Sequence, residues 1–286
     1  MTQNNRIVFY HDDLDGITAA AIVNHFYPDT EFVSVNYGDM WKPEEIEGKE
    51  VWVVDFSFPN MRELAEACDS LDWIDHHRTA MEQQREAWED KNIFGIRSLE
   101  KSGCELTWDY LKNPEARTPN IISLVGDMDM WQFKYKNTRA VCEAAVYELT
   151  DPKDNIWEVL FGSPIFSEAA EEDLEIHGSV LLEAKRRRVE QLFNHGTDIT
   201  FFGHRARIMN ATTDISTLGE YVYKQDDYDM AVMWQVINNE VILSFHSDTV
   251  DVGEIAESFG GGGHKAASGA TVDFRTLLNI MEGVDQ

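Results

Sequence analysis

The sequence IVFYHDDLDG, at residues 7–16, joins a short apolar run to a histidine, three aspartates and a glycine. A short apolar run bounded by polar residues is typical of a buried strand. Four later runs indicate strands in the same way: Phe32–Val35, Val51–Val54, Trp73–Ile74 and Ile121–Val125. Helix-like segments separate most of them, at Thr18–Phe26, Met61–Cys68, Ala80–Glu89 and Leu99–Leu111. This alternation predicts an α/β fold whose parallel sheet is covered by helices on both faces.

Acidic residues and histidines directly follow four of these predicted strands. The first strand leads into His11, Asp13 and Asp15, and the third leads into Asp55. The fourth is followed by Asp75-His76-His77, and the fifth by Gly126-Asp127. Ligands of open α/β sheets bind beyond the carboxyl ends of the strands. We therefore expect these side chains to meet in one crevice.

This combination of side chains predicts a metal site. Carboxylates with one or two imidazoles suit Mn, Fe or Zn ions, and the lack of nearby thiolates disfavours a structural zinc site. Gly16 permits a tight turn that lets the first motif wrap a pair of ions, and Asp55, alone at its strand end, suits a bridging ligand. Two close metal ions activate water and stabilise a leaving oxygen, which predicts hydrolysis of a phosphate ester. Each feature alone also fits a turn or a helix cap, but four in order favour the metal site.

The second half of the chain has a different pattern. A helix is predicted at Thr138–Leu149, and a long polar helix at about Glu168–Asn194. Strands follow at Ile199–Phe202, Ala206–Asn210, Met230–Val236 and Val241–Phe245, the last two forming a hairpin across Asn238-Asn239. A short helix, Val252–Phe259, then runs into four glycines. We expect a domain boundary near residue 195, with the long helix as the connector.

The run Gly260–Gly263 precedes His264 and Lys265. It fits a flexible turn between a helix and a strand. Four glycines carry a high cost in backbone entropy, however, which favours a close approach of the backbone to a ligand. Successive glycine amides beside His264 and Lys265 predict an anion-binding concavity.

Charge and composition limit the partners. The chain has 286 residues, and 52 Asp and Glu against 24 Lys and Arg give a formal charge of −28. Such a chain repels a long polyanion, so binding of long duplex nucleic acid is not expected. Three separated cysteines fit a reducing compartment, and neither a signal-peptide pattern nor a membrane-spanning apolar run is evident. We expect a soluble, cytoplasmic protein without a membrane partner.

The motifs HDDLDGITAA, VVDFS, WIDHHRTA, VGDMDMW and FGGGGHKAASGA resemble the DHH phosphoesterases that carry a C-terminal DHHA1 domain. They occur in the family's order and cover most of the chain, and the opening motif is most similar to the small oligoribonuclease (nanoRNase) type. The resemblance implies a parallel-sheet DHH catalytic domain at residues 1–165. A connecting helix at 166–195 would join it to a smaller mixed α/β DHHA1 domain at 196–286, which binds substrate.

The resemblance also implies roles for individual residues. His11, Asp13 and Asp55 would hold one Mn²⁺ ion, with Asp55 bridging to a second that is held also by Asp15, His76 and Asp127. A hydroxide between the ions would attack phosphorus, while His77 would stabilise the phosphoryl charge or protonate the leaving oxygen. Asp75 would orient its neighbour. Gly262, Gly263 and His264 would bind the substrate's phosphate or terminal nucleotide across an interdomain cleft.

Two positions depart from the family pattern. Where many members have an arginine before the final helix, this chain has His246, which is charged only part of the time near neutral pH. The fourth motif offers both Asp127 and Asp129. Asp127 is preferred as the ligand because it directly follows the predicted strand, and Asp129 is expected to cap or orient.

The first hypothesis is therefore an exonuclease-like, Mn²⁺-dependent phosphodiesterase that trims short RNA or DNA oligonucleotides to mononucleotides. A second is hydrolysis of cyclic dinucleotides or 3′-phosphoadenosine nucleotides in the same site. A third is a nucleotide-sensing module with little turnover, against which the complete set of metal motifs argues. The RNA or DNA preference, the polarity of hydrolysis and the formation of a homodimer stay open.

Overall fold

The computed structural model describes residues 5–283. The contacts within the chain divide it into two units between Leu182 and Glu183, inside the long helix α9 (Pro164–Asn194). The boundaries expected at residues 165 and 195 stay predictions. None of the helices within 5–283 combines the length and the apolar character needed to cross a membrane.

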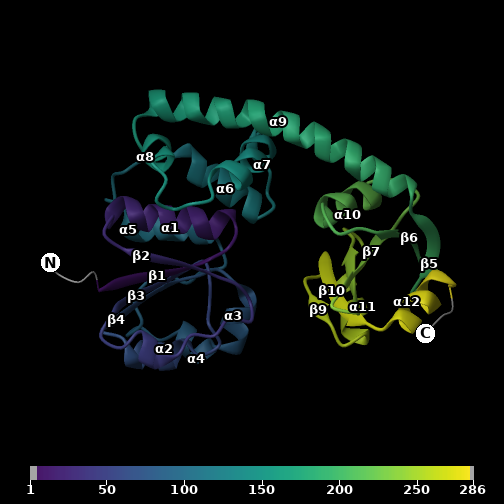
Figure 1. Cartoon of the computed structure of the whole chain (residues 1–286), viewed down its shortest axis with the longest axis horizontal. Helices are drawn as coiled ribbons and strands as arrows, with labels where there is room; N and C mark the ends of the chain where they lie inside the picture. Colours follow the sequence, from purple (N-terminus) through teal and green to yellow (C-terminus); the bar gives the residue numbers. More distant parts are fainter. Residues whose placement is uncertain (1–4, 284–286) are drawn as a thin grey trace. The chain divides into compact units, whose positions relative to one another are not determined.

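The first unit is built on a parallel sheet of four strands (Figure 1). The order β2-β1-β3-β4 places β1 (Arg6–His11) and β3 (Glu50–Val54) at the centre, with β2 (Glu31–Val35) and β4 (Ser70–Ile74) at the edges. Alternate side chains of β1 enter different cores: Val8 and Tyr10 pack on one face, Ile7 and Phe9 on the other. A strand that is buried on both faces needs this continuous apolar run.

Helices cover both faces of this sheet (Figure 1). One face packs against α1 (Leu14–Phe26) and α5 (Gly103–Leu111). The helices α6 (Asn120–Asp129), α7 (Thr138–Glu148) and α8 (Ile156–Phe161) join the same core by packing against α1. The other packs against α2 (Met61–Ala67), α3 (Arg78–Gln83) and α4 (Arg85–Trp88), near the short 3₁₀ helix η1 (Pro43–Glu45). The predicted α/β fold with a parallel sheet is confirmed.

The predicted fifth strand is wrong. Residues 121–125 lie in α6, which begins directly after Pro119. The buried positions Ile121, Ile122, Leu124 and Val125 follow helical spacing along one face. A short apolar run does not by itself distinguish a buried strand from a buried helix. The sheet of the first unit therefore has four strands, and the fourth motif comes from a helix.

The second unit is built on a mixed sheet in the order β5-β6-β7-β8-β10-β9. Its strands are β5 (Thr197–Phe201), β6 (His204–Asn210), β7 (Met230–Ile237), β8 (Glu240–His246), β9 (Gly262–Gly263) and β10 (Ala267–Val272). Only β6 and β7 pair in parallel. Asn238 and Asn239 have φ values of 50° and 67°, which suits the predicted tight hairpin between β7 and β8.

Helices cover both faces of this second sheet as well. One core includes α11 (Val252–Ser258) and α12 (Phe274–Met281), and the other includes α10 (Ile215–Tyr223) and Val189 of α9. The prediction of a long helix followed by a smaller mixed α/β region is confirmed. The sequence patterns had not indicated α10, α12 or the last two strands.

Candidate metal centre

The loop between β1 and α1 presents the first motif. His11 ends β1, and Asp13 caps α1 by accepting a hydrogen bond of 2.9 Å from the amide of Gly16. A Cβ at position 16 would lie 2.2 Å from the backbone oxygen of His11, so only glycine fits this turn. His11 Nδ1 lies 2.7 Å from Asp13 Oδ2 and 4.0 Å from Asp55 Oδ2. The tight turn thus brings an imidazole and two carboxylates together.

Asp15 is held by the start of a different helix. Its carboxylate accepts hydrogen bonds from the amides of Gly103 and Cys104, at 2.6 and 3.0 Å. These amides lie in the first turn of α5, where free N–H groups and the helix dipole favour an anion. A capping box formed by Ser102 and Glu105 begins that helix. Asp15 is therefore buried, 3% exposed, in a fixed orientation.

Asp55 lies at the centre of the cluster. It directly follows β3, is 1% exposed and has a φ of 54°, a left-handed conformation that is uncommon for residues other than glycine. Within residues 5–283, neither Asp55 Oδ1 nor His11 Nδ1 makes a hydrogen bond of acceptable geometry, although both atoms are buried and lie close to the side chains of His76 and Asp13. Buried polar atoms without partners are costly unless something else satisfies them. A cation would do so at both atoms.

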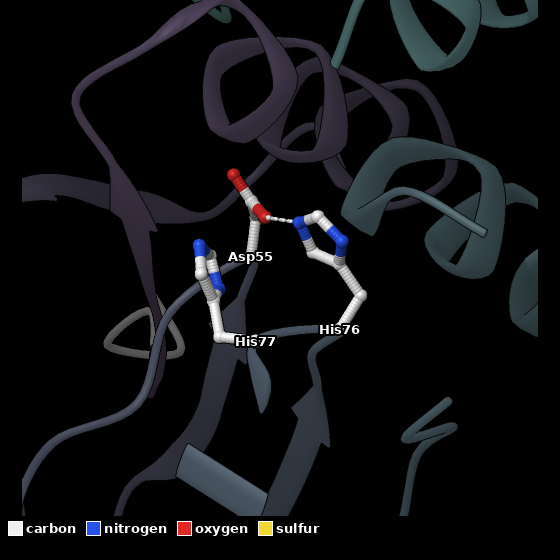
Figure 2. Close-up of side chains that lie close together, drawn as sticks. All are labelled: Asp55, His76 and His77. Atoms are coloured by element: carbon white, nitrogen blue, oxygen red, sulfur yellow. Dashed lines mark ion pairs between the residues drawn. The ribbon is translucent and has the colours of Figure 1, made fainter. Parts of the chain in front are cut away.

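His76 and His77 approach Asp55 from the end of β4. Figure 2 shows their imidazoles on either side of the Asp55 carboxylate, with His76 Nε2 3.1 Å from Asp55 Oδ1. Asp75 is fully buried and accepts hydrogen bonds from the His76 amide, at 2.8 Å, and from His77 Nδ1, at 2.7 Å. Ser57 donates to its second oxygen. These bonds orient His77, as expected of Asp75.

The ligand atoms form three overlapping groups, each within 4.8 Å: Asp55 with His76 and His77, His11 with Asp13 and Asp55, and Asp15 with His76 and Asp129. Asp55 and His76 each belong to two of them. Oxygen and imidazole donors of this kind suit divalent ions such as Mn²⁺, Fe²⁺ or Zn²⁺. The donor set, which includes two buried atoms that make no well-formed hydrogen bond within residues 5–283, therefore fits a metal centre.

Electrostatics favour a cation at the same place. Burial, together with the carboxylates of Asp15 and Asp13, raises the pKa of Asp55 well above its usual range. Burial and the same two neighbours raise the pKa of Asp129 to about 9. Burial lowers the pKa of His76. At His77 burial is the largest single influence and also lowers the pKa, but the bond to Asp75 and the charges of the nearby aspartates together outweigh it, so the pKa of His77 is raised. Like charges crowded in a buried site repel each other until a cation compensates them.

The two aspartates of the fourth motif lie in positions opposite to those expected. Asp127 lies inside α6 rather than at a strand end, and its carboxylate accepts hydrogen bonds from the amides of Lys134 and Tyr135 and from the hydroxyl of Thr138. It holds the segment after α6. Asp129, two residues further along α6, has its Oδ2 3.5 Å from His76 Nε2. The geometry places Asp129, not Asp127, in the cluster.

The glycine motif lies in the second unit. Gly262 and Gly263 form β9 and pair with β10, and His264 lies exposed in the turn that follows. The amides of Gly260, Gly261 and His264 donate to carbonyls of the chain itself. These three amides are therefore not free to form the predicted anion-binding concavity. His246 is buried, and its side chain packs against Gly219 of α10 so closely that a Cβ at position 219 would collide with it.

Comparison with known proteins gives the same two parts. Residues 5–127 match the model of the DHH family, N-terminal domain, and residues 207–284 match the model of the DHHA1 domain. The oligoribonuclease NrnB of Bacillus subtilis is 24% identical over 235 residues, which cover 74% of this chain and 55% of that protein. The chain spans about half the length of the curated relatives it matches.

Two solved structures share the fold. The pGpG-specific phosphodiesterase PggH of Vibrio cholerae superposes with a TM-score of 0.59 at 13% identity, covering 97% of this chain and 96% of that one. The exonuclease RecJ bound to manganese superposes with a TM-score of 0.57 at 15% identity, covering 99% and 90%. At these identities the likeness establishes the fold of the chain.

Proposed function

We propose, on the premise that the chain belongs to the DHH/DHHA1 phosphoesterases, that it is a metal-dependent phosphodiesterase that hydrolyses short oligonucleotides to mononucleotides. The observation that carries this proposal is the convergence of three imidazoles and four carboxylates, that of Asp55 among them, in three overlapping ligand groups. A binding module has no need of two adjoining metal groups beside a separately oriented histidine. A hydrolase needs all of these parts.

The three groups support a division of the ligands between two Mn²⁺ ions. His11, Asp13 and Asp55 would hold one, while Asp15, His76 and Asp129 would hold the other, and Asp55 would be shared. When bound, such ions activate a water for attack on phosphorus and stabilise the charge that develops on oxygen. The solved structure of RecJ with manganese supports the choice of metal. Asp127 would contribute only by holding the loop that follows Asp129.

His77 is the proposed catalytic residue, and neither of the two ligand sets includes it. Asp75 binds its Nδ1, which leaves Nε2 as the atom available to the substrate. Against the effect of burial, this bond and the charges of the nearby aspartates together raise the pKa of His77, so a larger fraction of the imidazole carries a proton near neutral pH. A protonated His77 would stabilise the phosphoryl charge or donate a proton to the leaving oxygen.

Charge supports a short substrate. A net charge of −28 opposes the approach of a long strand, whereas a dinucleotide brings few phosphates, which the metal ions compensate. The oligoribonuclease NrnB and the pGpG-specific enzyme PggH, whose names denote short substrates, support the same choice. Gly262, Gly263 and His264 would bind the far phosphate or the terminal nucleotide of the substrate.

The test is a comparison of end-labelled substrates. A linear dinucleotide, a strand of two dozen nucleotides and a cyclic dinucleotide are each incubated with the protein in Mn²⁺ and in excess EDTA. We expect fast release of mononucleotide from the dinucleotide, much slower release from the long strand, and none in EDTA. Faster hydrolysis of the cyclic dinucleotide would instead identify the second substrate class. Binding of all three without turnover would contradict an enzymatic function.

A further inference from the structure

Tyr37 is presented beside the metal centre by a short turn. It lies two residues after the end of β2 at Val35, whose register partner on β1 is His11. The turn runs from Asn36 to Asp39. The Asp39 amide donates a hydrogen bond of 3.0 Å to the Asn36 carbonyl, and the Asp39 carboxylate accepts one of 2.8 Å from the Asn36 amide. Gly38 has a φ of 100°, which suits the third position of a type II turn and leaves Tyr37 at the second.

The ring of Tyr37 contacts two histidines of the candidate metal centre, His11 and His77. Its centroid lies 5.1 Å from that of His11 and 6.0 Å from that of His77, at steep interplanar angles of 66° and 84°. Phe56, the residue after Asp55, supports it from a third side, at 5.6 Å. Such contacts fix an aromatic ring without covering it. Tyr37 nevertheless remains 63% exposed, while the side chains of His11 and His77 are 15% and 26% exposed.

An exposed aromatic ring next to a phosphate-processing centre has a clear chemical use. We propose that Tyr37 is the stacking platform for the nucleobase adjacent to the scissile phosphate, a proposal that rests on the function proposed above. Every nucleobase has a flat π-face, so stacking gives affinity without sequence preference. It also gives affinity that does not depend on charge. This matters for a chain with more than twice as many acidic as basic residues, 52 against 24.

The first experiment measures equilibrium binding of a product, so that it needs no turnover. Dissociation constants for adenosine 5′-monophosphate and ribose 5-phosphate are measured in Mn²⁺ by calorimetry. Loss of one base–aromatic stack corresponds to about 5-fold to 150-fold in affinity. We expect Tyr37→Ala to weaken the nucleotide by this factor and to leave ribose 5-phosphate unchanged, while Tyr37→Phe retains the wild-type preference. Tyr147→Ala is the matched control, because Tyr147 on α7 is 62% exposed and, within residues 5–283, makes no ring contact with His11 or His77.

The second experiment measures kcat/KM for a dinucleotide and for two analogues that lack one base each. The Tyr37→Ala defect should disappear with the analogue that lacks the stacked base, which also identifies that nucleoside. Two results would overturn the proposal and make Tyr37 a support for His11 and His77. One is an equal loss of kcat/KM in Tyr37→Ala with the intact dinucleotide and with both abasic analogues. The other is an equal loss of affinity for ribose 5-phosphate and for the nucleotide. A defect in Tyr37→Phe as large as in Tyr37→Ala would assign the role to the hydroxyl instead. If the wild-type protein binds the nucleotide through Tyr37 but hydrolyses no dinucleotide, the proposed function fails and the stacking site stands.

Discussion

Gly103 and Asp55 lie so close together that no side chain fits at position 103. A Cβ built there would lie 2.5 Å from the Cβ of Asp55 and 2.6 Å from its Oδ1. The amide of the same glycine donates to Asp15 Oδ2 at 2.6 Å. One residue at the start of α5 thus orients one aspartate of the cluster and leaves room for another, although it is not itself a ligand.

This relationship predicts the effect of Gly103→Ala. Alanine is a better helix former than glycine, so α5 should persist. The added methyl group must displace the buried Asp55 or shift the start of α5 away from Asp15. We expect Mn²⁺ affinity, measured by calorimetry, to fall at least tenfold while the far-ultraviolet circular dichroism stays native. A folded variant with wild-type Mn²⁺ affinity would refute the spatial argument.

Asp127→Asn and Asp129→Asn should separate structure from metal binding. Asp127 accepts three hydrogen bonds, from Lys134, Tyr135 and Thr138, and an amide would direct N–H groups at those donors. We expect Asp127→Asn to reduce the free energy of unfolding by about 1–3 kcal/mol with little change in Mn²⁺ affinity per folded molecule.

Asp129→Asn should behave in the opposite way, because it removes a carboxylate that lies 3.5 Å from His76 Nε2 and carries no such set of structural bonds. Its metal-free stability should be unchanged or higher, with weaker Mn²⁺ binding. Urea unfolding in EDTA and Mn²⁺ calorimetry measure the two quantities. Weaker Mn²⁺ binding in Asp127→Asn, with lost stability in Asp129→Asn, would instead favour Asp127 as the ligand.

Buried His246 should make stability depend on pH. Burial lowers its pKa below the usual value of about 6.5, so between the two pKa values the unfolded chain binds a proton that the folded chain does not. Stability is therefore complete above about pH 6.5 and falls as the pH drops toward the folded pKa, by up to about 1.4 kcal/mol per pH unit. Urea unfolding in EDTA at pH values above and below 6.5 measures this slope. His246→Asn should have a smaller slope, and an equal slope in both proteins would contradict the assignment.

His264→Ala should affect binding and not chemistry. A hydrogen bond to a charged group contributes about 1.5–3 kcal/mol, so the KM for a dinucleotide should rise about tenfold or more. Mn²⁺ affinity and hydrolysis of the small ester bis-p-nitrophenyl phosphate, which needs no far phosphate contact, should be retained. Loss of the small-ester activity with intact metal binding would instead assign His264 to the chemical step.

The sequence predicts the first unit well where local chemistry decides the structure. The apolar runs of β1, β3 and β4 end at a histidine or an aspartate, and the parallel sheet necessarily brings those ends together. The approach of His11, Asp13, Asp55 and His76 follows from this. Residues 121–125 were misassigned because an apolar run of five fits a buried helix equally well, and the choice of Asp127 over Asp129 depended on that error.

Other features depend on tertiary contacts that no local pattern contains. Gly103 matters because α5 packs against the end of β3, and Tyr37 matters because its turn lies beside His11. The capping box of Ser102 and Glu105 can be recognised in the sequence as a helix start. It does not indicate that the carboxylate of Asp15 would bind to the amides of that helix. The dipeptide Tyr37-Gly38 indicates a turn without indicating what the tyrosine contacts.

The central claim is that the cluster around Asp55 holds two metal ions that act together on a phosphodiester. Metal-stripped protein is titrated with Mn²⁺, and the bound metal per chain and the initial rate of dinucleotide hydrolysis are measured in the same samples. We expect two ions per chain, little activity before the second binds, and loss of both activity and full occupancy in folded Asp55→Asn. Hydrolysis at the full rate in EDTA, with one bound ion, or in Asp55→Asn would contradict the account.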